Sequence, residues 1–138
     1  MRADYRKDND HFKFVNVNPK HKLRAGDCVI RAIAFATGAE WENVYLGLTS
    51  LGFTMGDVPN AVPVYAAYLK NLGLTKSPSP RKTDGRKYTL LEFAQEFTKS
   101  KGTYVIKISN HLTCVQNGYI CDTWDCSNYC VGNYWKIK

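Results

Sequence analysis

The first half of the chain carries apolar residues at helical spacing. Residues 28–37 are apolar at nearly every position, follow Asp27, which is a favourable N-cap residue, and stop at Gly38. Arg31 is the single charge within this run. Because a helix that is apolar on almost all sides belongs inside a domain, we predict a buried central helix over 28–37.

Three further segments have the apolar periodicity of helices: 40–51, 63–72, and a segment that begins after Thr89. Gly52 and Gly73 follow the first two, and glycine is common just after a helix. Thr89 and Glu92 have the spacing of a capping box. The positions expected to face inward are Trp41, Val44, Tyr45 and Leu48 in the first, Val64, Ala67, Tyr68 and Leu72 in the second, and Leu90, Leu91, Phe93, Ala94 and Phe97 in the third.

From Gly102 onward the pattern changes to that of strands. Residues 103–108 are β-branched and aromatic, residues 111–116 follow, and Asn117-Gly118 is the strongest short signal for a two-residue hairpin turn. The remaining strands are predicted at 119–124 and 133–137, with a short edge strand at 12–17 before the turn at Asn18-Pro19. Helices that precede strands predict an α+β fold, in which the N-terminal helices pack on a small C-terminal antiparallel sheet.

Composition places the chain among ordinary soluble domains. Its 138 residues, 44% hydrophobic and 22% charged, suit one domain spanning residues 1–138, and no apolar run approaches the roughly 20 residues of a membrane span. The segment Met1–Asp8 is charged with no apolar stretch behind it, which predicts no secretory signal and a cytoplasmic location. The net charge of +7 is scattered, so a nucleic-acid partner is the disfavoured alternative. Its densest part, 76–87, also carries Pro, Ser and Gly and is predicted to be a mobile basic loop.

Five cysteines are too few for a disulfide scaffold, and their number is odd. We therefore expect mostly free thiols in a reducing compartment. Four of the five lie between residues 114 and 130, beside a histidine, so a structural zinc site is an alternative for this region. The candidate ligands of that site are His111, Cys114, Cys121, Cys126 and Cys130, among which no two cysteines have the two-residue spacing of common zinc motifs.

Cys28 is the candidate nucleophile because it opens the predicted central helix. The free N–H groups and the positive end of the helix dipole favour thiolate over thiol there. Taken alone, a cysteine is more often a buried small hydrophobic residue than a nucleophile. Position alone therefore does not decide the role of Cys28.

The hairpin register supplies the other candidate groups. A two-residue turn at 117–118 places Cys114 opposite Cys121, Thr113 opposite Asp122, and His111 on the same face as Asp122 as a diagonal neighbour. Each of these residues alone has an ordinary structural explanation. Their combination with a thiol at a helix start predicts a nucleophile, a general base and an orienting carboxylate in Cys28, His111 and Asp122. The rival histidines, His11 and His21, have no carboxylate predicted to face them, and Asp125 is a rival expected to point to the opposite face.

The segments Gly26-Asp27-Cys28-Val29-Ile30-Arg31-Ala32-Ile33-Ala34, His111 and Gly118-Tyr119-Ile120-Cys121-Asp122-Thr123-Trp124 together resemble the papain-like cysteine peptidase superfamily. The similarity is to its small bacterial and phage members, such as the peptidase domains that cut double-glycine leader peptides. The resemblance implies a papain-like fold, a hydrolase without a cofactor or metal, and a peptide or protein substrate. It also implies that Cys28 is the nucleophile, His111 the base and Asp122 the group that holds the imidazole.

The chain departs from that family at the oxyanion hole. Papain-like peptidases usually carry a glutamine a few residues before the nucleophile, and no glutamine precedes Cys28. Asn18 or Asn16 is the predicted substitute, with the backbone N–H of Cys28 as second donor. The nucleophile helix also resembles that of ovarian-tumour deubiquitinases, although Leu112 stands where an aromatic residue commonly follows their histidine. A third hypothesis is a non-catalytic binding module that uses basic residues of the 76–87 segment, Arg81, Lys82, Arg86 and Lys87, together with exposed tyrosines.

Overall fold

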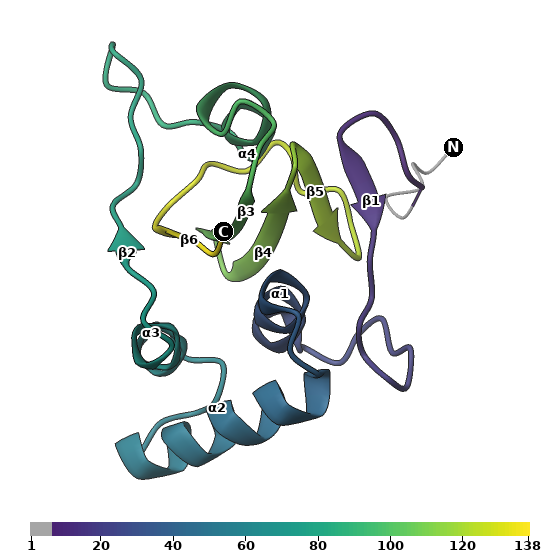
Figure 1. The fold of residues 1–138 in the computed structure, drawn as a ribbon, viewed down its shortest axis with the longest axis vertical. Helices are drawn as coiled ribbons and strands as arrows, with labels where there is room; N and C mark the ends of the chain where they lie inside the picture. Colours follow the sequence, from purple (N-terminus) through teal and green to yellow (C-terminus); the bar gives the residue numbers. More distant parts are fainter. Residues whose placement is uncertain (1–6) are drawn as a thin grey trace.

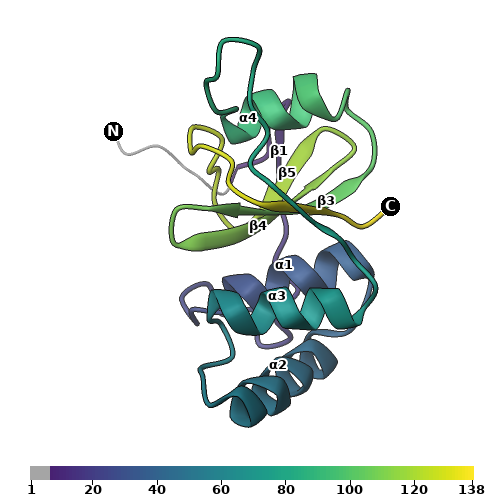
Figure 2. The ribbon, with the colours of Figure 1, turned by 90° about the vertical axis from the view of Figure 1, so that its left-hand side faces the viewer.

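The computed structural model describes residues 7–138, which form an α+β fold built around a six-stranded mixed sheet (Figure 1). Figure 2 shows helices α1 (Cys28–Thr37) and α3 (Val62–Asn71) on one face of the sheet and helix α4 (Leu90–Glu92) on the other, with α2 (Trp41–Met55) outermost. The predicted α+β class is confirmed. The prediction that the chain has no secretory signal was based on the segment Met1–Asp8. Residues 1–6 of that segment lie outside the described residues. Within residues 7–138, no helix combines the length and the apolar character needed to cross a membrane.

Helix α1 has the bounds that the sequence predicts, and Gly38 ends it in the left-handed conformation. Its buried residues contact strand β4 (His111–Gln116) and helix α2. Ile33 is fully buried, as an apolar central helix requires. Asp27 occupies the N-cap position, as predicted, although its side chain makes no capping hydrogen bond.

Helix α2 is longer than predicted. It passes through Gly52 and ends at Gly56, whose φ of 73° is left-handed. Gly52 serves close packing instead, because a Cβ there would lie 2.8 Å from the carbonyl oxygen of Asp57. Gly52 therefore marks a tight contact with the segment that follows the helix and not the end of α2.

The remaining helices lie in the predicted segments, but not all of the residues expected to face inward are buried. Helix α3 buries Val64, Tyr65 and Leu69, whereas Leu72, expected to face inward, is exposed. Helix α4 begins with the predicted capping box, in which Thr89 and Glu92 exchange hydrogen bonds. It continues as a π-helical turn, η1 (Phe93–Phe97), and packs on the sheet through its buried apolar residues.

The predicted hairpin is confirmed, with Asn117 and Gly118 both at positive φ and Cys114 opposite Cys121. The sheet itself is larger than predicted and is not purely antiparallel. Its strands β1 (Phe12–Phe14), β5 (Tyr119–Asp122), β4, β3 (Thr103–Ile108), β6 (Tyr134–Lys136) and β2 (Lys76–Ser77) lie side by side in that order. Strand β1 pairs in parallel with β5. Strand β2 belongs to the segment predicted to be a loop, where a backbone bridge also joins Arg81 to Lys87.

Candidate active site

Cys28 begins helix α1 and lies half-buried at the edge of a cleft of about 340 Å³. Val29, Tyr65, His111 and Leu112 line the same cleft. The thiol thus contacts strand β4 at its first residues, which is where the sequence predicts the histidine. The cleft also leaves room beside the sulfur for another molecule.

His111 and Asp122 come together as the hairpin register predicts. Nε2 of His111 donates to Oδ2 of Asp122 at 2.7 Å, and the two side chains are 10% and 3% exposed. The same carboxylate accepts hydrogen bonds from the hydroxyl of Thr113 at 2.6 Å and from the backbone N–H of Thr123 at 2.6 Å. Asp122 is therefore fixed from several sides, and its hydrogen bond fixes the orientation of the imidazole.

The electrostatics of the pair favour a protonated imidazole. Burial opposes a positive charge on His111, but hydrogen bonds with Asp122, Cys126 and Cys28 and the charge of Asp122 raise its pKa to about 11. Burial would also raise the pKa of Asp122, yet the neighbouring His111, Thr113 and Arg31 hold it below its usual value. Asp122 and His111 thus form an ion pair at neutral pH.

The pKa of the Cys28 thiol shifts in the opposite direction to that of His111. Its burial favours the neutral thiol, but a hydrogen bond with His111, another with the backbone of Leu112, and the charges of His111 and Arg31 together lower its pKa. A lowered pKa at the sulfur beside a raised one at the imidazole favours a thiolate–imidazolium pair. Such a pair provides both a nucleophile and a proton donor.

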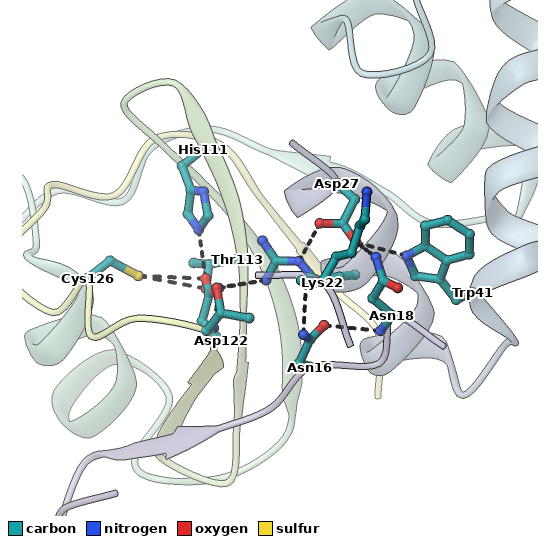
Figure 3. A network of polar contacts seen from close by, with 11 residues as sticks. Asn16, Asn18, Lys22, Asp27, Trp41, His111, Thr113, Asp122 and Cys126 are labelled. Carbon is teal, nitrogen blue, oxygen red and sulfur yellow. Dashed lines mark hydrogen bonds and ion pairs between the residues drawn. The ribbon is translucent and has the colours of Figure 1, made fainter. Parts of the chain in front are cut away.

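Arg31 is a member of this site that sequence reasoning missed. One turn after Cys28, its guanidinium donates through Nη1 to Asp122 Oδ1 at 3.0 Å and through Nε to Asp27 Oδ1 at 2.9 Å. Asp27 in turn accepts from Asn18 Nδ2 and Trp41 Nε1, each at 3.0 Å. Figure 3 shows this network, which runs from His111 through Asp122 to Asp27 and on to Trp41. The sequence feature that could have identified Arg31 as part of the site is its position as the single charge in an otherwise apolar helix.

Cys126 is a second neighbour of the imidazole that the sequence did not assign to the triad. Its sulfur lies 3.9 Å from Oδ2 of Asp122 and 3.8 Å from the hydroxyl of Thr113. Among the described residues, the one group with metal-ligating atoms within 4.8 Å of one another is His111, Asp122 and Cys126. Asp122 already binds the guanidinium of Arg31, whose charge opposes a cation at this place.

The other candidate zinc ligands do not join that group. Cys114 and Cys121 face each other across β4 and β5, and Cys114 packs in the core beneath α1. Cys130 is exposed. The alternative zinc site with these cysteines among its ligands is therefore not assembled within the described residues.

A second histidine–carboxylate pair lies elsewhere, contrary to the expectation that His11 has no facing carboxylate. Nε2 of His11 lies 2.9 Å from Oδ2 of Asp125, and Nδ1 lies 3.1 Å from Oδ1 of Asp10. No cysteine hydrogen-bonds with either partner among the described residues. His11 therefore ties β1 to the loop after β5.

The two candidate oxyanion donors, Asn18 and Asn16, are used within the N-terminal segment. The amide nitrogen of Asn18 donates to Asp27, and that of Asn16 donates to the carbonyl oxygen of Lys22 at 3.0 Å. Neither residue lines the cleft at Cys28, whereas the side chains of Asn60 and Asn110 do. An oxyanion role for Asn16 or Asn18 stays a prediction.

Comparison with known proteins gives no relative. No protein-family model matches the sequence, and no curated protein and no solved structure is detectably similar to it. The geometry of the site is therefore what indicates a function for this chain.

Proposed function

We propose that this protein is a cysteine-dependent hydrolase of peptide or other amide bonds, a diverged relative of the papain-like peptidases. The observation that carries the proposal is that Cys28 and His111 line one cleft, with the pKa of the thiol lowered and that of the imidazole raised to about 11. Asp122 supports the imidazole at 2.7 Å. The position of the thiol at the start of a buried helix that packs on a strand-borne histidine also supports the proposal.

The proposed reaction is acyl transfer in two steps. The Cys28 thiolate attacks the carbonyl carbon of the substrate, and the resulting tetrahedral intermediate collapses as the C–N bond breaks. His111 gives its Nδ1 proton to the leaving amine, because Nε2 is engaged with Asp122. Neutral His111 then removes a proton from water, which attacks the thioester. The acid leaves, and the thiolate–imidazolium pair is restored.

Selective alkylation of the five cysteines tests the nucleophile. Iodoacetamide labelling near pH 6, where an ordinary thiol is almost fully protonated, is followed by intact-protein and peptide mass spectrometry. We expect rapid labelling of Cys28 in wild type, slow labelling in His111→Gln, and no rapid phase in Cys28→Ala. Cys130→Ala is the matched control, since it removes an exposed thiol outside the site and should leave the rapid phase unchanged.

A second measurement tests hydrolysis itself. Internally quenched peptide libraries are incubated with wild type and with Cys28→Ala, and the released termini are identified by mass spectrometry. Cleavage by wild type alone supports the proposal. A reactive Cys28 that cleaves no peptide or simple amide contradicts the hydrolase, and equal, slow labelling of all five cysteines contradicts the activated thiol and favours a non-catalytic module.

A further inference from the structure

Two hollows border the first turn of α1, and Cys28 lines the first of them. The first is the cleft of about 340 Å³ that contains Cys28 and His111. The second, of about 370 Å³, is lined by residues that include Gly26, Asp27 and Trp41. Asn60 borders both hollows, whereas residues 28 and 29 line the first and residues 26, 27 and 30 line the second. Each hollow has the volume of a typical ligand site.

Three lysines line these hollows and are available to bind a ligand. Lys107 lines the first hollow, and Lys20 and Lys22 line the second. Within residues 7–138, none of the three forms an ion pair. The carboxylate that lines the second hollow, Asp27, is neutralised by Arg31 at 2.9 Å and is 5% exposed. Both the hollow that contains Cys28 and the hollow next to it therefore offer positive charge to a ligand.

The remaining lining is suited to a polypeptide. Asn60 and Asn110 carry side-chain amides that form no hydrogen bond within the described residues, and an amide both donates to and accepts from a peptide backbone. Tyr65 gives the first hollow an apolar wall. In the second, the rings of Trp41 and Tyr45 lie 5.2 Å apart and form another.

We infer that the two hollows form one groove for an acidic polypeptide segment, with carboxylate side chains on both sides of the bond presented to Cys28. This inference rests on the proposed function, which it deepens by naming the substrate class. The acidic residue on one side meets Lys107, and that on the other meets Lys20 and Lys22. A polypeptide fits better than a nucleic acid because Cys28, which lines the first hollow, needs an acyl carbonyl for the proposed reaction, and peptides supply one at every residue.

Three internally quenched peptide libraries test the preference. All have a random centre, flanked on both sides by Asp and Glu, by Asn and Gln, or by Lys and Arg. We expect wild type to cleave the acidic library with a kcat/KM about tenfold above that for the neutral one, since several partly exposed ion pairs act together. The triple variant Lys20→Gln, Lys22→Gln and Lys107→Gln should lose most of this preference. The triple variant Lys99→Gln, Lys101→Gln and Lys136→Gln is the matched control, because these exposed lysines line neither hollow and should leave the preference intact.

Binding to the Cys28→Ala protein separates the groove from the chemistry. Fluorescence anisotropy with a fluorescein-labelled acidic peptide should report binding that the groove-lysine variant loses and the control variant keeps. Such binding without cleavage by wild type supports the groove and contradicts the hydrolase. Cleavage with equal rates for acidic and neutral libraries contradicts the groove and leaves the hydrolase. Groove-lysine-dependent binding of a labelled single-stranded oligonucleotide, with none of the acidic peptide, also overturns the inference.

Discussion

Two thiols act on the pKa of the same imidazole, and their own pKa values shift in opposite directions. Cys28 has a lowered pKa, whereas the pKa of Cys126 is raised, first by its burial and then by the charge of Asp122. Cys126 is 1% exposed, and its sulfur lies 3.9 Å from that carboxylate. An influence on His111 is thus common to both residues and does not by itself select the nucleophile.

The surroundings beyond the imidazole make the difference. Cys28 stands at the start of α1, near the backbone of Leu112 and the charge of Arg31, all of which favour an anion. Cys126 faces a carboxylate in a closed interior, where a thiolate would be repelled and poorly solvated. The comparison predicts that one face of His111 serves chemistry and the other serves structure.

The largest expected effect separates the two sulfurs directly. Cys28→Ser should reduce kcat/KM on a cleavable peptide by about 10⁵-fold, because loss of a covalent nucleophile removes the main reaction path. Cys126→Ser, which is nearly isosteric, should change it by less than about fivefold, since a serine hydroxyl keeps the hydrogen bond to Asp122. Steady-state kinetics on matched preparations measure both, and comparable losses in the two variants would refute the division of roles.

The next effect concerns the carboxylate behind the imidazole. Asp122→Asn should lower kcat by about 10² to 10⁴-fold, because the amide neither favours the imidazolium nor fixes its tautomer. It should also lower the reactivity of Cys28 at pH 6, because the imidazolium that stabilises the thiolate is lost. Asp125→Asn is the control, since this residue pairs with His11 at 2.9 Å, away from the thiol. An equal kinetic loss in the control would contradict the assignment of Asp122.

Arg31 is expected to affect stability and reactivity together. Arg31→Met leaves Asp27 and Asp122 buried without their shared cation, so the free energy of unfolding should fall by about 3 to 5 kcal/mol. The pKa of Cys28 should rise as well. Arg86→Met is the control, because its pair with Asp84 is exposed and should contribute less than about 1 kcal/mol.

Urea denaturation measures these free energies, and a titration of thiolate absorbance measures the pKa. Arg31→Lys keeps the charge but loses the fork that reaches two carboxylates, so it should fall between wild type and Arg31→Met. A loss of stability in Arg31→Met with an unchanged Cys28 pKa would show that Arg31 serves only the fold.

The sequence predicted the parts of this site that depend on local pattern. The helix start at Cys28 follows from an apolar run after Asp27, and the His111–Asp122 contact follows from the period of two in a hairpin closed by Asn117-Gly118. These features are set within about fifteen residues of chain, where periodicity and turn chemistry are strong. The α+β class followed from the order of the same patterns.

What the sequence did not predict depends on contacts between distant segments. Cys126 reaches the imidazole because the chain turns back after β5, and Arg31 meets Asp122 across 91 positions. Strand β1 pairs in parallel with β5. No local sequence pattern predicts this pairing. The prediction that a helix ends at Gly52 is wrong for the same reason, because the close approach of the Asp57 backbone explains the glycine.

The pH dependence of stability sharpens the comparison further. The pKa of His111 is raised from 6.5 to about 11, so its contribution is complete below pH 6.5 and is lost as pH rises toward 11. The pKa of Cys28 is lowered from 9.0, so its contribution is complete above pH 9.0 and is lost as pH falls through the folded value. Where these two windows overlap, folded and unfolded states bind equal numbers of protons at this pair, and its contribution is independent of pH.

Cys28→Ala should expose the histidine contribution alone. Its free energy of unfolding is expected to fall relative to wild type by up to about 1.4 kcal/mol per pH unit in that overlap, the limit for one proton. Cys126→Ala should retain the wild-type dependence, because its thiol is protonated in both states there. Urea denaturation at several pH values measures the slopes, and parallel curves for wild type and Cys28→Ala would show that no ion pair forms.

The smallest expected effect lies on the structural face of the imidazole. The hydroxyl of Thr113 donates to Oδ2 of Asp122 at 2.6 Å and lies 3.8 Å from the sulfur of Cys126. Thr113→Val keeps the shape and removes one of several donors to a carboxylate, which should cost about 1 to 2 kcal/mol of stability. Because the bonds of Asp122 to His111 and Arg31 remain, kcat should fall only a few-fold and Cys126 should stay unreactive toward iodoacetamide. Rapid labelling of Cys126 in this variant would mean that a single hydroxyl, and not burial beside a carboxylate, keeps the second thiol protonated.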